Sequence, residues 1–199
     1  MWFEQIQRIA TLAHARYRND ALLVIAIDGC GGAGKSTLSQ ALAEQVAHWS
    51  RVQVVNLDDF YRPLTTEQQS TLTRDQAQKA YFDVAPYRQN VLEPLTRGID
   101  VTYRPNHWIN GEVDQPVTLQ ASGVLIVDGV FSFSESVRSL VSLSVFVDTP
   151  LQLRKKRLVQ RPQEDVGWVN HWQQTEAWHH HHQNTATAVE FVLVGTADQ

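Results

Sequence analysis

The segment IAIDGCGGAGKST, residues 25–37, decides the fold of this chain. It begins as an apolar run typical of a buried strand, continues through four glycines, and ends in a lysine and two hydroxyl residues that open a helical pattern. Residues 29–36 match G-x-x-x-x-G-K-[ST] at every fixed position, and the strand before and helix after them are the context that this pattern requires. The sequence therefore predicts a phosphate-binding loop between a strand and a helix.

Such a loop supplies hydrogen-bond donors at a density that side chains cannot reach. The backbone N–H groups turn inward as an anion-binding nest, and the following helix adds the positive end of its dipole. Lys35 is expected to reach the β- and γ-phosphates of a nucleotide, and the Ser36 hydroxyl to hold Mg²⁺. We expect ATP and Mg²⁺ as cofactors, with the nucleotide bound by Gly29, Gly31, Gly32, Ala33, Gly34, Lys35, Ser36 and Thr37.

Apolar runs and helical patterns alternate along the rest of the chain. Strands are predicted at 21–27, 52–57, 123–129, 142–149 and 189–194, and helices at 3–17, 35–48, 67–80, 90–97, 150–161 and 168–182. Residues 100–105 and 115–120 are expected to form a hairpin beside the main sheet. This alternation predicts an α/β fold with a mostly parallel sheet and helices on both faces. We expect one domain over residues 1–199.

Composition excludes several classes of protein. The net charge of −4 disfavours a nucleic-acid partner, and no apolar window approaches the length of a membrane span. Cys30 is the only cysteine, so an intrachain disulfide is excluded and a reducing compartment fits. Residues 1–20 carry charge throughout and lack the apolar core of a signal peptide. We expect a cytoplasmic protein with a small-molecule substrate and no membrane or nucleic-acid partner; homo-oligomer formation stays open.

Two features near the C-terminus are expected to be structural. Neighbouring histidines on a helix point in different directions, so the run His179–His182 cannot bind one metal as a set and is expected to be solvated surface. Trp168, Trp172 and Trp178 are expected to be packing residues.

Carboxylates follow two of the predicted strands. Asp128 ends the run VLIVD and suits the acid that P-loop proteins place near the metal, although a turn aspartate is the alternative. Asp58 and Asp59 follow the run ending at Leu57, and strand alternation is expected to send their side chains to opposite sides. In phosphoryl transfer to a hydroxyl, one of this pair would accept the proton, whereas a plain turn role stays open for Asp59.

Taken together, the segments IAIDGCGGAGKST, NLDDFYRP, YFDVAPYRQNVLEPL, VLIVDG and VFVDTPLQLRKKRLVQR occur in the order seen in the uridine kinase and phosphoribulokinase family. The chain resembles this family over residues 21–161, and above all its bacterial uridine-kinase-like members. The resemblance implies a P-loop NTPase fold like that of nucleoside monophosphate kinases. It implies a small lid at about 154–170 and an acceptor-side insertion, with the hairpin, at about 62–118. The implied activity is transfer of the γ-phosphoryl group of ATP to a hydroxyl of a small metabolite, uridine or cytidine first.

The resemblance also implies roles for individual carboxylates. Asp58 falls where the family keeps its catalytic base, and Tyr61 where a tyrosine lines the acceptor pocket, with Asp59 beside them. Asp83 matches the carboxylate that holds sugar hydroxyls in uridine kinases. Asp128 replaces a glutamate that is common at the metal-side position.

Basic residues of the implied lid complete the phosphate site. Arg154, Arg157 and Arg161 match the spacing of the family's lid helix, and at i, i+3 and i+7 they share one helix face. The resemblance implies that Arg154 and Arg157 assist catalysis together with Lys35, and that Arg161 binds the nucleotide.

The base-reading segment departs from the uridine kinase pattern. Asn106-His107-Trp108 stands in place of a tyrosine-aspartate-aromatic trio, and Gly111 falls where a histidine belongs. His107 and Trp108 remain candidates for contacts to an aromatic ring of the substrate.

Two other functions stay open. A nucleoside monophosphate kinase would need arginines around its acceptor, and Arg62, Arg74, Arg88 and Arg104 could supply some of them. A nucleotide-dependent switch without phosphotransfer would have no need of the carboxylate pair in DDFY.

Overall fold

The computed structural model describes residues 2–62, 64–105, 115–160 and 166–196. Its centre is a five-stranded sheet in the order β2-β5-β1-β6-β7, in which each neighbouring pair is parallel. The strands are β1 (Leu22–Asp28), β2 (Val52–Asn56), β5 (Gly123–Asp128), β6 (Leu143–Asp148) and β7 (Phe191–Val194). All five predicted strands are confirmed, with small shifts at their ends.

Helices join the strands of this sheet. They are α1 (Phe3–Arg16), α2 (Lys35–Val46), α3 (Thr66–Thr71), α4 (Arg74–Tyr81), α5 (Val84–Tyr87), α6 (Glu93–Thr96), α7 (Leu151–Val159), α8 (Val166–His182) and α9 (Thr185–Ala188), with the 3-10 helices η1 (Leu57–Phe60) and η3 (Arg138–Leu140) and the π-helical turn η2 (Arg88–Leu92). The single helix predicted over 67–80 is divided in two, because Thr65 and Thr73 each form a capping box, with Gln68 and Gln76 respectively.

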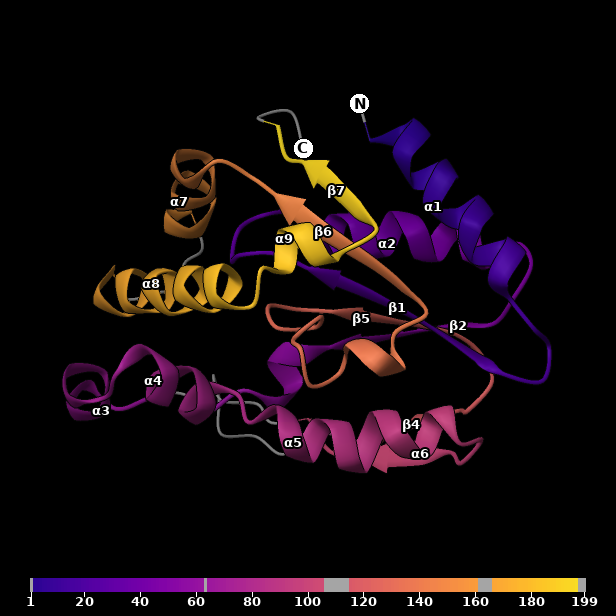
Figure 1. Ribbon diagram of the computed structural model, residues 1–199, viewed down its shortest axis with the longest axis horizontal. Helices are drawn as coiled ribbons and strands as arrows, with labels where there is room; N and C mark the ends of the chain where they lie inside the picture. Colours follow the sequence, from indigo (N-terminus) through magenta and orange to yellow (C-terminus); the bar gives the residue numbers. More distant parts are fainter. Residues whose placement is uncertain (1, 63, 106–114, 161–165, 197–199) are drawn as a thin grey trace.

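Strand alternation divides the core between the two faces of the sheet. Leu23, Ile25 and Ile27 of β1 pack with α1 and α2, whereas Val24 packs with the apolar side chains of α4, α6 and the hairpin. Figure 1 shows α1 and α2 on one side of the sheet and α5 and α6 on the other. The predicted three-layer arrangement is confirmed.

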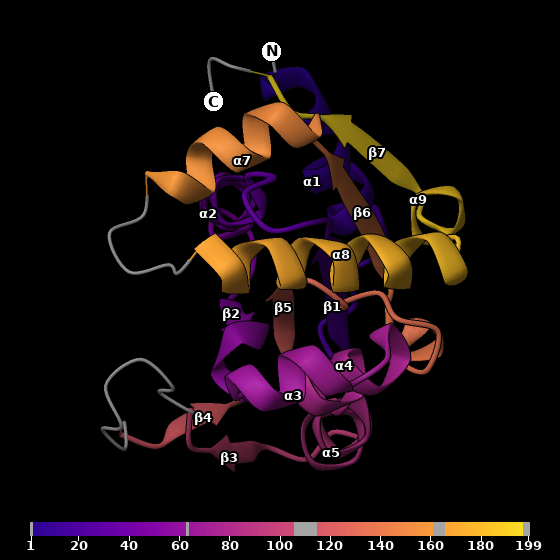
Figure 2. The ribbon, with the colours of Figure 1, turned by 90° about the vertical axis from the view of Figure 1, so that its left-hand side faces the viewer.

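The predicted hairpin is also present, formed by β3 (Val101–Tyr103) and β4 (Val117–Leu119) in antiparallel pairing. Figure 2 shows it on the same side of the sheet as α5, apart from the main strands. Residues 106–114, which join its strands, lie outside the described residues. No helix in the described part of the chain is long and apolar enough to cross a membrane.

All strands of the main sheet run in one direction, so the loops that follow them meet at one edge. Figure 2 looks toward this edge and shows α8 crossing in front of it, with α7 above and α4 below. In a parallel α/β sheet, ligands bind at the carboxyl ends of the strands. The search for a site therefore starts there.

Candidate active site

The glycine-rich loop spans residues 29–34 between β1 and α2, where the sequence predicts it. Gly32 has φ +74°, and a Cβ on it would lie 2.9 Å from the carbonyl oxygen of Arg154. Gly34 is the N-cap of α2, which directs the unpaired first-turn N–H groups of that helix along the loop. The loop therefore leads into the first turn of α2, whose N–H groups suit an anion, whereas the N–H groups of Gly29, Gly31 and Ala33 already bond within the protein.

Lys35 is the first residue of α2. Its ammonium group donates to the carbonyl oxygen of Cys30 at 3.2 Å, which folds the side chain back over the loop. Burial raises the pKa of the Asp28 and Asp128 carboxyls, and the nearby Lys35 charge opposes that rise. Lys35 therefore lies where it can attract the phosphates that the loop would hold.

The predicted metal-side residues lie close together. The Ser36 hydroxyl lies close enough to the Asp128 carboxyl to influence its pKa. Burial raises the pKa of Asp128, and the charge of Lys35 and the Ser36 hydroxyl oppose that rise. Among the described residues no three His, Cys, Asp or Glu side chains cluster as a metal cage. A hydroxyl and a single carboxylate fit Mg²⁺, which is bound by few protein ligands together with phosphates and water.

The carboxylate pair lies in η1 rather than on the strand. Asn56 caps this turn, its side chain accepting from the N–H of Asp58 at 3.0 Å, so strand alternation does not apply to the pair. Asp58 is exposed, and its charge raises the pKa of Asp128, which places the two carboxylates within electrostatic reach of each other. Asp59 points elsewhere and accepts a 2.8 Å bond from the hydroxyl of Tyr103 in the hairpin.

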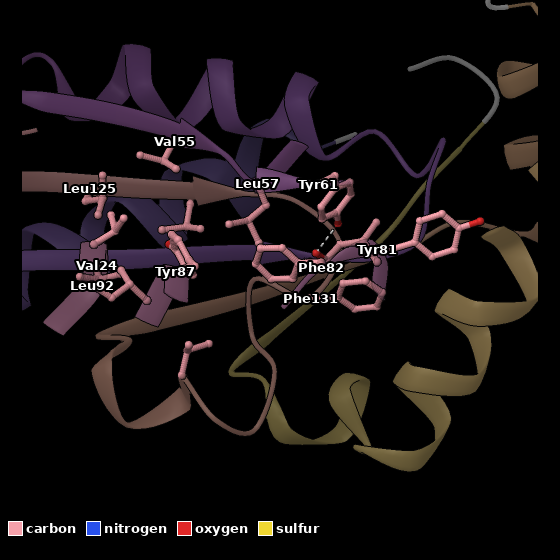
Figure 3. Close-up of a cluster of buried hydrophobic side chains, with 14 of the residues drawn as sticks. Val24, Val55, Leu57, Tyr61, Tyr81, Phe82, Tyr87, Leu92, Leu125 and Phe131 are labelled. Atoms are coloured by element: carbon pink, nitrogen blue, oxygen red, sulfur yellow. Dashed lines mark hydrogen bonds between the residues drawn. The ribbon is translucent and has the colours of Figure 1, made fainter. Parts of the chain in front are cut away.

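Tyr61 lies at the core of an aromatic cluster. Its hydroxyl donates to the carbonyl oxygen of Val130 at 2.7 Å, and its ring packs against Phe82, Phe131 and Trp172. Figure 3 shows Tyr61 beside Phe82 and Phe131 in this layer. Burial raises the pKa of Tyr61, and the charge of Asp58 adds to the rise. Trp172 is buried here, which confirms its prediction as a packing residue.

Asp83 lies at the rim of a cavity of about 520 Å³. It is the N-cap of α5, accepting from the N–H of Ala85 at 3.1 Å, and it is exposed. The cavity is lined by Asp75, Gln78, Lys79, Phe82, Asp83, Val84, Ser134, Glu135, Ser136, Trp178, His179, His182 and Gln183. His107, Trp108 and the side chain of Trp168 lie outside the described residues.

The lid arginines contact the loop from α7. Arg154 pairs with Glu176 of α8 at 2.8 Å. Arg157 donates to the carbonyl oxygens of Gly32 and Ala33 at 3.1 and 3.2 Å. Arg161 lies outside the described residues, and α7 ends two residues before it.

Asp28 is a functional candidate that the sequence analysis missed. It ends β1, is fully buried, and accepts backbone N–H bonds from Gly29 at 2.7 Å, Phe131 at 3.0 Å and Phe133 at 2.9 Å. Phe131 has φ +76°, a strained value for a bulky residue that persists when neighbours hold it. Asp28 therefore joins the phosphate loop to the loop that follows β5. A carboxylate directly before the first glycine was the available signal.

The expectation that His179–His182 form solvated surface is wrong for the first two residues. His179 is fully buried against Phe131, with ring centroids 4.3 Å apart, and His180 is buried with its ring 5.1 Å from Phe146. Burial lowers the pKa of His179 to about 4 and that of His180 to about 3, so both are neutral at pH 7. The physical reason is that α8 turns this side toward the sheet.

Comparisons with known proteins agree with this geometry. A uridine kinase of Limosilactobacillus reuteri is 27% identical over 162 residues, which cover 75% of this chain and 69% of that protein. A chloroplastic uridine/cytidine kinase of Arabidopsis thaliana is 30% identical over 72% of this chain, but over only 30% of its own length. The structure of a "Possible Uridine Kinase" from Bacillus stearothermophilus superposes with a TM-score of 0.72 at 17% identity, covering 96% of this chain and 97% of that one.

The family model covers most of the chain. Residues 24–172 match the model of the phosphoribulokinase / uridine kinase family, a span that includes the phosphate loop, the carboxylate pair and the lid helix. The parallel five-stranded sheet, with the glycine-rich loop between β1 and α2, is that of a P-loop kinase. This chain belongs to the phosphoribulokinase / uridine kinase family.

Proposed function

We propose that this ATP- and Mg²⁺-dependent kinase phosphorylates a hydroxyl of a small nucleoside-like metabolite, with uridine and cytidine as the first candidates. Kinases of this family are phosphotransferases that act on hydroxyl groups. Relatives named uridine kinase and uridine-cytidine kinase support a nucleoside as the acceptor, at 27% and 26% identity.

One observation carries the proposal: the exposed Asp58 follows Asn56 by two residues, and Asn56 is the β2 partner of Asp128 at the end of β5. A hydroxyl acceptor must lose its proton as it attacks the γ-phosphate, and a carboxylate beside the metal site can accept that proton. A nucleotide switch needs no such group. The bond from Tyr103 to Asp59 ties η1 to the hairpin and so steadies Asp58.

The remaining residues would divide the work of transfer between binding and charge stabilisation. The N–H groups that open α2 and the Lys35 ammonium would hold the phosphates, and Ser36 and Asp128 would hold Mg²⁺, which would supply positive charge against the developing negative charge. A bond forms from the acceptor oxygen to the γ-phosphorus while the bond to the bridging oxygen of ADP breaks. The acceptor proton passes to Asp58.

The acceptor side is proposed to include the cavity beside Asp83. Its lining is largely apolar but includes carboxylates, amides, hydroxyls and imidazoles, the groups that bind sugar hydroxyls. Asp83 is exposed at its rim and would accept hydrogen bonds from such hydroxyls. Its volume of about 520 Å³ suits a metabolite of nucleoside size.

The rival function, a nucleoside monophosphate kinase, loses support from the arginines that it would use. Arg88 forms an ion pair with Glu93 at 2.8 Å, and Arg74 donates to the side chain of Gln174. Two of the four arginines that this rival would use therefore already have partners within the protein, which weakens the case for a phosphate acceptor.

The test is a product assay by mass spectrometry with ATP, Mg²⁺ and a panel of nucleosides, nucleoside monophosphates, pentose phosphates and vitamins. A phosphorylated nucleoside is the expected product, and the Lys35→Met variant controls for a contaminating kinase. A nucleoside diphosphate as the main product would establish the rival function, and no product from any acceptor would favour a switch.

A further inference from the structure

Glu176 of α8 is a buried carboxylate set directly on the phosphate loop. Its Oε2 accepts a 2.7 Å hydrogen bond from the N–H of Gly31, and its Oε1 accepts one of 2.8 Å from Nη1 of Arg154. The residue is fully buried. Burial raises the pKa of this carboxyl, whereas the Gly31 N–H and Arg154 oppose the rise. A buried carboxylate is stable only when hydrogen-bond donors satisfy its oxygens, and here each of the two oxygens has one donor.

The close contact between Glu176 and the phosphate loop depends on the absence of a side chain at Gly31. A Cβ on Gly31 would lie 3.3 Å from Oε2 of Glu176 and 3.4 Å from Nε1 of Trp172. Gly31 precedes the N-cap Gly34 by three residues, so Glu176 leaves the N–H groups that open α2 for phosphate. Glu176 can therefore keep its place while the loop holds a nucleotide.

Arg154 is fixed by the same contact. Besides Nη1, its Nε donates to the carbonyl oxygen of Thr149 at 3.0 Å, and these two bonds set the plane of the guanidinium. Within the described residues, Nη2 makes no recorded hydrogen bond. That end of the group is left for a ligand, and it lies on the helix that packs against Gly32.

We propose that Glu176 is a positioning residue that holds the Arg154 guanidinium beside the loop, so that Nη2 stabilises the terminal phosphate of ATP during transfer. The proposal rests on the kinase function above. Glu176 itself touches no substrate and acts only through Arg154 and Gly31.

The variant Glu176→Gln separates this role from simple packing. A glutamine has nearly the same shape, but its amide offers one acceptor and one donor to two donors, so one of the two contacts fails. We expect kcat to fall about 10- to 100-fold, because a misplaced charge stabilises the transition state poorly. The KM for ATP should change less than about threefold, since the helix-end N–H groups remain. Thr175→Val is the matched control, because the hydroxyl of this buried neighbour donates within α8, to the carbonyl oxygen of His171.

A double-mutant cycle tests whether the effect passes through Arg154. In an Arg154→Met background, Glu176→Gln should lower kcat no further, since residues that act as one unit are not additive. Equal losses in both backgrounds, or an unchanged kcat in Glu176→Gln alone, would overturn the proposal. ATP hydrolysis without an acceptor is followed in parallel, so the test does not depend on identifying the substrate.

A spectroscopic measurement keeps the proposal testable in the absence of turnover. The side-chain Nε–H signal of Arg154, assigned by its loss in Arg154→Met, should be sharp in the wild type with ADP bound. It should broaden or vanish in Glu176→Gln, but not in Thr175→Val. A sharp, unshifted signal in Glu176→Gln would show that Arg154 is held by other means, whatever the acceptor of the kinase proves to be.

Discussion

Ser36, in the first turn of α2, lies beside Asp128, the last residue of β5, although the two are far apart in the sequence; burial raises the pKa of the Asp128 carboxyl, and the Ser36 hydroxyl opposes that rise. The parallel pairing of β1 with β5 brings them together, because it sets Ile27 opposite Asp128 and so places the phosphate loop beside the end of β5. A hydroxyl and a carboxylate placed in this way are two oxygen groups of the kind that Mg²⁺ binds together with phosphates and water.

The first prediction concerns that pair. Asp128→Asn removes the negative charge but keeps an acceptor for Ser36, so the fold should persist while Mg²⁺ binds more weakly. We expect a rise of about 10- to 100-fold in the Mg²⁺ concentration needed for half-maximal rate, the range of one lost charged contact. The measurement is the initial rate against Mg²⁺ at constant ATP. Asp148→Asn, an exposed carboxylate at the end of β6, is the control and should match the wild type.

Asp58→Asn is expected to separate nucleotide binding from transfer. The side chain is exposed and its amide isostere should leave η1 intact, so affinity for ATP should change little. The rate of transfer should fall about 10²- to 10⁴-fold, as when a general base is removed. Calorimetric titration with ATP and a single-turnover assay measure the two quantities. Asp59→Asn, which can still accept the Tyr103 bond, should lose less than about tenfold; full transfer by Asp58→Asn would rule this base out.

The strand–loop–helix core was predictable because its signals are local. The glycine pattern predicts the loop, and apolar runs of strand length predict β1, β2 and β5. The alternation of strands and helices along the chain predicts the fold that contains them. The placement of Asp58 and Asp59 was not predictable. The Asn56 side chain caps the turn that leads the chain into η1, and this role can be seen only once β2 is known to end at Asn56.

Glu176 and the buried histidines were missed for a different reason. Trp172, Thr175, Glu176 and His179 recur at i, i+3, i+4 and i+7 and form the buried side of α8, but three of the four are polar. Hydrophobic periodicity cannot detect such a stripe, because the partners that allow polar burial come from the phosphate loop and α7, distant in sequence.

Gly32→Ala is expected to weaken ATP binding in addition to destabilising the fold through backbone strain. Its φ of +74° disfavours alanine, and the added Cβ would also meet the carbonyl oxygen of Arg154 at 2.9 Å. Gly98→Ala is the matched control, with φ +83° and no atom within 4 Å of the new Cβ. Each should lose roughly 1 kcal/mol or more of unfolding free energy to the positive φ. Only Gly32→Ala should also weaken ATP binding. Urea denaturation measures the stability of both variants and nucleotide titration measures their affinity for ATP. Equal ATP affinity in the two variants would contradict the close packing of α7 against the loop.

His180 gives the last prediction, on acid sensitivity. Its pKa is about 3 in the folded protein, lowered by burial, against about 6.5 in an unfolded chain. Below pH 6.5 the unfolded state binds the extra proton, so the folded state loses about 1.4 kcal/mol per pH unit until the pH nears 3. His180→Gln does not titrate, so its unfolding free energy should fall about 2 kcal/mol less than that of the wild type between pH 7 and pH 5. Raised carboxyl pKa values act in the opposite sense; those away from His180 cancel in the difference, whereas Asp28, whose Oδ1 lies 3.8 Å from Nε2 of His180, adds a smaller change of its own. Urea denaturation at each pH measures the free energy of unfolding, and His181→Gln, at an exposed position, is the control. If the free energy of unfolding changes equally with pH in His180→Gln and the wild type, His180 is not buried as a neutral ring.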